Sequence, residues 1–292
     1  MANLAKIGEF NIGGDLPVRR FGFGAMRLTG KGVWGPPENL SEARAVLGRA
    51  VEMGINFIDT ADVYGPGDNE RLIRDTLQPY PIELVIGTKG GMIRSGPATP
   101  ENPGMATDGS EVHLRKAVEG SLRDLGVERI DLYQLHRVDP AIPIEETMGL
   151  FRKLRDEGKI RHIGLSEVGV DEIERARSVV EIATVQNQYN LATRKYDDVL
   201  AYCEKSGIGF FPFYPQRIGK LADAKEMTDI TARESATPAQ VALAWLLKKS
   251  PVLIPIAGTS SVKHLEQNVA ACDVSLSQDD MRVLERLAAV AP

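Results

Sequence analysis

Short apolar runs of strand length alternate with helical patterns along the whole chain. Eight such runs recur within the 292 residues, at positions 21–26, 55–59, 83–89, 130–136, 160–166, 182–188, 208–214 and 251–258. Between them, apolar residues return at spacings of three and four, which is the period of a helix with one buried face. The alternation predicts an α/β protein with parallel strands and helices packed against the sheet.

The even repetition of this unit favours a closed sheet over a doubly wound one. Since composition does not change along the chain, we predict a single (β/α)8 TIM barrel domain over residues 1–292. An N-terminal β-hairpin at about residues 5–15 and an extra C-terminal helix at about residues 277–289 are the expected additions. One helix start is explicit, because Thr237, Pro238 and Gln240 combine a cap, a first-turn proline and a capping-box partner.

One segment is too long for a minimal strand-to-helix connection. GGMIRSGPATPENPGMATDG follows Lys89 and is rich in glycine and proline. Loops of this length are functional or mobile. The segment is either a flap over the mouth of the barrel or a loose insertion.

Composition narrows the classes of partner. With a net charge of -5, 43% hydrophobic and 26% charged residues, the chain shows no broad basic surface for a nucleic acid. Cys203 and Cys272 lie far apart and outside any redox or metal spacing, which indicates a reducing compartment and inert packing roles. No stretch approaches the roughly 20 apolar residues of a membrane span. We expect a cytoplasmic protein without metal, membrane or nucleic-acid partners.

Four polar residues follow or end consecutive predicted strands. Asp59 ends INFID, Tyr64 lies in the loop after it, Lys89 ends ELVIGTK and His136 ends IDLYQLH. Active sites of (β/α)8 barrels lie at the carboxyl ends of the strands, so the four side chains can converge. Each alone has an ordinary structural explanation: a helix cap, a packed ring, a solvated lysine and a core histidine.

Together the four residues form a chemical unit. An ammonium near a phenol favours phenolate, so we expect Lys89 to lower the pKa of Tyr64 from about 10 toward the operating range. Asp59 would hold the lysine in place. A tyrosine tuned in this way is a proton donor for a carbonyl oxygen.

These motifs resemble those of the aldo-keto reductases. The resemblance spans almost the whole chain, through GFGAMRL, GINFIDTADVYG, the strand-end TK, DLYQLH, IRHIGLS, VQNQYN and IPIAGTSSVKHLEQN. It implies that Asp59, Tyr64, Lys89 and His136 are the family's catalytic tetrad. The implied reaction is hydride transfer from a nicotinamide to an aldehyde or ketone, with Tyr64 protonating the oxygen and His136 positioning the carbonyl.

The nicotinamide end of the cofactor site is implied by the same resemblance. The chain lacks G-x-G-x-x-G, since GFGAMR has Arg27 at the third glycine position, as the family allows. Ser166 and Gln186 are expected to bind the carboxamide. Glu167 stands where asparagine is frequent, and a carboxylate cannot donate a hydrogen bond, which puts that contact in doubt. Phe213 is expected to stack on the ring, or else to pack in the core.

The remaining cofactor contacts are expected on two later segments. Tyr214, Pro215, Gln216 and Arg217 replace the usual serine, proline, leucine and glycine over the pyrophosphate. Arg217 either clamps phosphate or points to solvent. The adenosine end is expected on the segment around a helix start, whose free amides would bind an anion: Gly258, Thr259, Ser260, Lys263, His264, Gln267 and Asn268. We expect NADPH over NADH, although His264 replaces the arginine frequent in NADPH-preferring relatives.

Substrate residues are the least defined part of the sequence. Met26, Trp34 and Met92 are candidates for the pocket wall, with loop packing as the alternative for Trp34. The long C-terminal loop of many relatives is not expected, which would leave an open site for small aldehydes. The GKGVWGPPEN segment and the length resemble bacterial relatives that reduce pyridoxal.

Three other functions compete with carbonyl reduction. A metal-dependent hydrolase needs clustered ligands, whereas the four histidines are scattered. A Schiff-base aldolase could use Lys89, but an adjacent carboxylate would keep that amine protonated. A cofactor-binding regulatory subunit, a role known in the family, would keep the fold without turnover.

Overall fold

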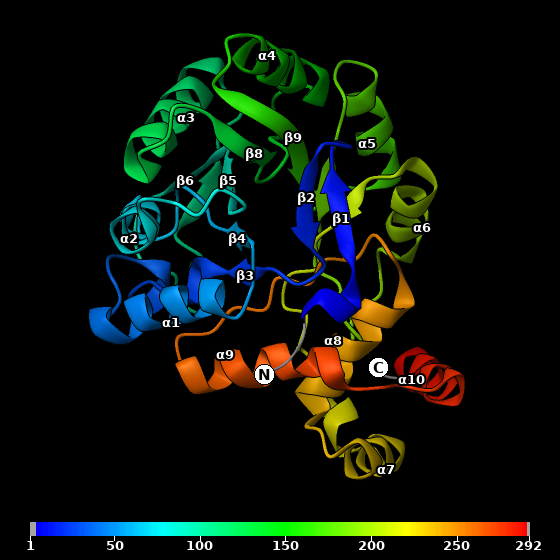
Figure 1. Cartoon of the computed structure of the whole chain (residues 1–292). Coiled ribbons are helices and arrows are strands. Elements are labelled where there is room, and N and C mark those ends of the chain that lie inside the picture. Colours follow the sequence, from blue (N-terminus) through cyan, green and yellow to red (C-terminus); the bar gives the residue numbers. More distant parts are fainter. Residues whose placement is uncertain (1–3, 291–292) are drawn as a thin grey trace.

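A curled parallel sheet surrounded by helices forms the body of the protein (Figure 1). The computed structural model describes the backbone of residues 4–290 and the side chains of residues 4–288. Seven parallel strands lie in the order β11-β10-β9-β8-β5-β4-β3. Their bounds are β3 Phe23–Gly24, β4 Phe57–Asp59, β5 Val85–Gly90, β8 Ile130–Leu135, β9 Ile160–Ser166, β10 Thr184–Gln186 and β11 Gly209–Phe210. The predicted α/β barrel is thereby confirmed.

The eighth predicted strand is replaced by an irregular extended segment that still closes the barrel. Residues 251–258 contain no regular strand, and this part of the prediction is wrong. Isolated parallel bridges join Leu253 to Phe210 on one side and Ile256 to Gly22 on the other. Pro251 and Pro255 lack N–H groups, so the segment cannot donate to a continuous ladder.

Helices cover the outer face of the sheet (Figure 1). Buried apolar side chains of the strands pack together with those of the helices. Their bounds are α1 Leu40–Glu52, α2 Asp68–Leu77, α3 Glu111–Leu125, α4 Ile144–Asp156, α5 Val170–Arg177, α6 Asp197–Ser206, α7 Lys225–Glu234, α8 Pro238–Lys249, α9 Val262–Val269 and α10 Gln278–Val290. The capping box of Thr237 and Gln240 at the start of α8 is confirmed. The extra C-terminal helix is also confirmed, as α10, one residue from its predicted bounds.

A β-hairpin closes the end of the barrel where the strands begin (Figure 1). Its strands, β1 Glu9–Ile12 and β2 Leu16–Arg19, lie about four residues later than predicted, because the paired glycines at 13 and 14 form the turn instead of ending it. Ile12 and Val18 pack against Phe57 and other residues of the barrel interior. The hairpin therefore seals one end and leaves the other for ligands.

The long segment after Lys89 folds back over the open end. It contains an antiparallel pair, β6 Met92–Arg94 and β7 Met105–Thr107, and of the two predicted readings the structure favours the flap. Arg94 holds it in place by donating hydrogen bonds to the carbonyls of Val63 and Gly32. None of the helices within residues 4–290 has the length and apolar character of a membrane span.

Candidate active site

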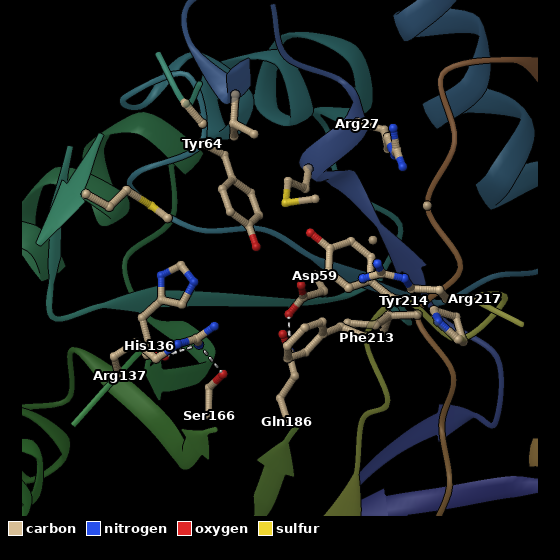
Figure 2. A pocket seen from close by; sticks show the side chains of 18 of the residues that line it. Arg27, Asp59, Tyr64, His136, Arg137, Ser166, Gln186, Phe213, Tyr214 and Arg217 are labelled. Atoms are coloured by element: carbon tan, nitrogen blue, oxygen red, sulfur yellow. Dashed lines mark hydrogen bonds between the residues drawn. The ribbon is translucent and has the colours of Figure 1, made fainter. Parts of the chain in front are cut away.

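The four tetrad candidates meet at the carboxyl ends of the strands. Asp59 is the last residue of β4, Lys89 lies near the end of β5, and His136 directly follows β8. Tyr64 lies in the turn between β4 and α2, and its hydroxyl points into a cavity of about 720 Å³ that Asp59 and His136 also line (Figure 2). The sequence order of the strands thus brings distant residues to one place.

A buried ion pair forms the base of this cluster. The Lys89 ammonium donates to Asp59 Oδ2 over 2.7 Å and to the carbonyl of Thr60 over 2.8 Å. Its side chain is fully buried, and that of Asp59 is 3% exposed. Asp59 also accepts hydrogen bonds from the amides of Gln186 and Gln134, at 2.7 and 3.3 Å. The carboxylate is therefore satisfied on both oxygens, which is what a buried charge requires.

Tyr64 lies beside this pair, with the Lys89 ammonium 5.2 Å from the centre of its ring. The expected net lowering of the Tyr64 pKa is wrong, although the Lys89 charge acts in the expected direction. Burial raises the pKa of the phenol, and the Lys89 charge offsets this only in part, since Asp59 adds an opposing negative charge. Tyr64 is therefore a neutral phenol, the protonation state that a proton donor needs.

His136 faces Tyr64 at the same end of the barrel. The two ring centres are 6.0 Å apart and the rings are nearly perpendicular. Burial, and then the positive charge of Lys89, lower the pKa of His136 well below its ordinary value, so the imidazole is neutral. Its buried Nδ1 has no hydrogen-bond partner among the described residues. A carbonyl group bound between Tyr64 and His136 would meet both polar groups.

The cavity gathers most, though not all, of the predicted site residues. Besides three members of the tetrad, its wall includes Met26, Ser166, Gln186, Phe213, Tyr214, Pro215, Gln216, Arg217 and Gly258. Lys89 lies behind Asp59, away from the cavity surface. Ser260 lines a neighbouring cavity of about 620 Å³ that shares Met26, Arg27, Val33 and Tyr214 with the first. The two predicted ends of the cofactor site are thus adjacent.

Three predicted residues point elsewhere or support the site indirectly. Glu167 does not line the cavity, because its carboxylate accepts a 2.6 Å hydrogen bond from the backbone N–H of Gln188. Trp34 lines neither of the two cavities and is 40% exposed. Met92 packs in an apolar cluster that includes Tyr64, so it supports the tyrosine without reaching the cavity surface.

The predicted anion site at the start of α9 is partly occupied by the protein itself. The Val262 amide donates to the carboxylate of Glu42 over 3.0 Å, and the Ser261 amide donates to Thr259 Oγ1 over 3.2 Å. These amides are therefore not free, contrary to expectation. Within the described residues, the next two backbone amides of α9, at Lys263 and His264, donate no hydrogen bond.

The other predicted residues of the adenosine segment contribute contacts within the protein. The main cavity is not lined by the other predicted residues of this segment, which are Thr259, Lys263, His264, Gln267 and Asn268. The Asn268 side chain accepts a 2.6 Å hydrogen bond from Gln216, which connects α9 to the loop after β11. Gln267 accepts one through its carbonyl from Gln240. These bonds fix the position of the segment relative to the cavity.

Two glycines bring the backbones of neighbouring segments close together beside the cavity. A Cβ atom at Gly258 would lie 2.3 Å from the carbonyl oxygen of Gly24, which is too close for any side chain. The close approach requires glycine at 258. At these two glycines the cavity wall between β3 and residues 251–258 has no side chains. A ligand can therefore approach the backbone there.

Several residues of the cavity wall were not predicted from the sequence. They are Gly24, Arg27, Val33, Arg94, Ala98, Pro103, Met105, Arg137 and Ile256. Arg137 could have been found, since it follows His136 at a strand end. The flap residues have no such signal, because nothing in a long loop fixes which side chain turns inward.

Backbone strain also marks this region. Four non-glycine residues among 4–290 have positive φ, and Val33 and Tyr214 among them line the cavity, with φ of 59° and 50°. A third, Glu167 with φ of 57°, follows Ser166. Left-handed conformations are unfavourable for such side chains and concentrate at functional sites.

Sequence comparison then decides the family. The model of the aldo/keto reductase family matches residues 20–289. The chain belongs to the aldo-keto reductase family. It is 46% identical over 267 residues to an uncharacterized oxidoreductase of Schizosaccharomyces pombe, covering 91% of this chain and 85% of that protein. It is 38% identical over 278 residues to pyridoxine 4-dehydrogenase of Escherichia coli, covering 93% and 96%.

Solved structures agree with this aldo-keto reductase assignment. The glycerol dehydrogenase of Gluconobacter oxydans superposes with a TM-score of 0.85 at 27% identity, covering 98% of this chain and 96% of that one. An aldo-keto reductase of Klebsiella pneumoniae in complex with NADPH gives 0.79 at 26% identity, covering 96% and 94%. The protein is therefore an oxidoreductase that acts on carbonyl compounds. Because these relatives include a fungal protein and a bacterial one, the resemblance to bacterial members does not establish a bacterial origin for this chain.

Proposed function

We propose that this aldo-keto reductase uses NADPH to reduce small aldehydes or ketones to alcohols, with Tyr64 as the general acid. The observation that carries the proposal is the arrangement of a neutral phenol, a neutral imidazole and a buried ammonium–carboxylate pair beside one cavity. Such a set can donate a proton to a carbonyl oxygen, and its buried ammonium can stabilise the phenolate that remains.

Each tetrad residue has a distinct role in this proposal. Tyr64 donates the proton, and His136 orients the carbonyl through its ring nitrogen. Lys89 compensates the phenolate that remains on Tyr64 after proton transfer, because its charge is 5.2 Å from the ring centre. Asp59 holds Lys89 at 2.7 Å and so fixes where that charge lies.

The cavity wall fits a nicotinamide dinucleotide. It combines an aromatic ring at Phe213, polar groups at Ser166 and Gln186, and the cationic side chains of Arg27 and Arg217. When bound, the cofactor would supply the hydride. Ser166 and Gln186 would hold the carboxamide, and the two arginines would favour the phosphates. The NADPH-bound Klebsiella relative supports NADPH as the preferred form.

Pyridoxal is the specific substrate we infer for this site. The support is the 38% identity with pyridoxine 4-dehydrogenase over nearly all of both chains. The apolar side chains of Met26, Val33 and Met105 line the cavity and would suit a flat aromatic ring.

The Tyr64→Phe variant tests the proposal. Loss of the proton donor should lower kcat/KM for aldehyde reduction about 10²–10⁴-fold, with little change in the dissociation constant of NADPH. NADPH absorbance with a panel of aldehydes, pyridoxal included, measures the first, and fluorescence titration the second. Tyr202→Phe is the matched control, since Tyr202 lines neither cavity and its hydroxyl accepts a hydrogen bond from Arg177 at the surface. A wild-type protein that binds NADPH and reduces no aldehyde would instead favour a regulatory subunit.

A further inference from the structure

Arg137 places an unassigned positive charge at the edge of the active-site cavity (Figure 2). It directly follows His136, and its Nη1 donates to the carbonyl of His136 over 2.5 Å and to Ser166 Oγ over 3.0 Å. Its guanidinium carbon lies 5.9 Å from the centre of the Phe213 ring. Arg137 therefore contacts two of the residues proposed to hold the nicotinamide.

The charge of Arg137 has no carboxylate partner. No ion pair involves it within the described residues, although Glu167 follows Ser166 in the chain. The Glu167 carboxylate has other partners. Oε1 accepts a 2.6 Å hydrogen bond from the backbone N–H of Gln188. Oε2 lies 3.5 Å from the Tyr196 hydroxyl and 3.8 Å from the Lys195 ammonium. The site thus contains an uncompensated guanidinium rather than a neutralised one.

The neighbouring polar groups define what this cation can bind. The Asp59 carboxylate can only accept hydrogen bonds, so the Gln186 atom 2.7 Å from its oxygen is Nε2, the donor. The other side-chain atom of Gln186, Oε1, remains as an acceptor. Oε1 can accept from the NH₂ group of a carboxamide. The carboxamide oxygen can accept two hydrogen bonds, one from the Ser166 hydroxyl and a second from Arg137, whose hydrogen bonds within the described residues use only Nη1 of its planar fork.

We propose that Arg137 is a cofactor-binding residue that donates to the nicotinamide carboxamide and favours the reduced cofactor over the oxidised one. The inference rests on the proposed function. The oxidised ring carries a positive charge and the reduced ring is neutral, so an unpaired guanidinium nearby repels only the oxidised form. Arg137 thereby biases the protein toward binding NADPH and releasing NADP⁺, which suits carbonyl reduction.

Dissociation constants of three ligands test this role without any turnover. NADPH, NADP⁺ and 2′,5′-ADP, which lacks the nicotinamide, are titrated against wild type, Arg137→Met and Arg137→Lys. In Arg137→Met, the dissociation constant of NADPH should rise about tenfold, whereas that of 2′,5′-ADP should not change. Binding of NADP⁺ should weaken less, so the NADP⁺-to-NADPH ratio of dissociation constants should fall about fivefold.

Arg137→Lys keeps the charge and loses the fork. It should weaken binding of NADPH and NADP⁺ equally and retain the wild-type ratio. Arg282→Met removes an exposed arginine on α10 and serves as the control for loss of a surface charge. Thermal unfolding of each variant shows whether the fold is intact.

Other outcomes would overturn the inference. Equal weakening of all three ligands in Arg137→Met would assign Arg137 a purely structural role. Unchanged cofactor binding with a higher KM for a carboxylate-bearing aldehyde, and not for its uncharged analogue, would assign it to the substrate. If wild type binds none of the three ligands, the proposed function itself fails, whereas the first two outcomes leave that function intact.

Discussion

The two ends of the barrel treat their polar groups in opposite ways. At the closed end, Asn56 accepts a hydrogen bond from the Arg19 amide and donates one to the carbonyl of Pro17, so hairpin and barrel satisfy each other. At the open end, the buried Nδ1 of His136 lacks a partner among the described residues, and Arg137 lacks a carboxylate. The ion pairs differ too, since Lys89–Asp59 is buried and Arg161–Asp15 at the closed end is partly exposed.

This contrast shows where the fold is organised for a ligand. Unsatisfied buried groups cost free energy, so a protein retains them where something else completes them. The Asn56 hydrogen bonds at the closed end are complete within the chain and serve stability. The open end has donors and charges arranged for groups that the chain itself does not supply.

The largest effect is expected from breaking the buried pair. Lys89→Met leaves the Asp59 carboxylate, 2% exposed, with only the amides of Gln186 and Gln134. We expect the free energy of unfolding to fall by about 3–5 kcal/mol, because an unpaired buried charge remains. Urea denaturation at neutral pH measures the change.

A second variant separates charge from packing at this pair. Asp59→Asn in the Lys89→Met background removes the stranded charge and keeps an oxygen for Gln186. Much of the lost stability should therefore return. A double variant no more stable than Lys89→Met would show that packing of the lysine stem, and not the charge, accounts for the loss.

A somewhat smaller effect is expected at Glu70, behind the open end. Its carboxyl accepts a 2.6 Å hydrogen bond from Thr88, the residue before Lys89. Burial raises the pKa of Glu70 from 4.5 to about 7. The folded protein therefore binds more protons than the unfolded chain between these values, and this group lowers stability as pH rises through the window.

Glu70→Gln should remove that pH dependence. Above pH 7 the variant should be more stable than wild type by about 3 kcal/mol, and the difference should vanish near pH 4. Urea denaturation across this range measures it. A variant less stable than wild type at pH 8 would mean that the ionised carboxylate makes a favourable contact.

The sequence predicted the barrel because its signals are local and repeat many times. Strand-length runs and helix periods each specify an element, and closure follows from their order. The exception is residues 251–258, whose apolar run predicts a strand although Pro251 and Pro255 of the same run cannot donate to a ladder. The hairpin was displaced for a similar reason, since Gly13 and Gly14 could end a strand or turn it.

The site was predicted less completely because side-chain partners are not local. The tetrad candidates follow from strand ends, but Glu42 on α1 bonds the α9 amide 220 residues later, which no spacing could indicate. The direction of the Tyr64 pKa shift depends on how deeply the phenol is buried, and a motif does not show burial. Arg137 differs from these, because it directly follows His136 at the end of β8 and the strand-end rule applies to it as well.

The smallest effect is expected from breaking the ion pair at the closed end. Arg161 Nη2 donates to Asp15 over 2.8 Å, and His162 bonds the other oxygen of that carboxylate at 2.7 Å. The Asp15 side chain is 60% exposed, so water competes for it, and Arg161→Met should cost about 1 kcal/mol or less.

The pH dependence of this loss provides a further check on the pair. The hydrogen bond from Arg161 lowers the pKa of Asp15 below 3.8, so its contribution is present above that value and lost as pH falls through the lowered pKa. Urea denaturation of wild type and Arg161→Met at pH 7 and below pH 3 measures the stability loss and its disappearance at low pH. A loss comparable to that of Lys89→Met would contradict the contrast between the two ends, because it would place an equally indispensable charge where the barrel is closed by apolar packing.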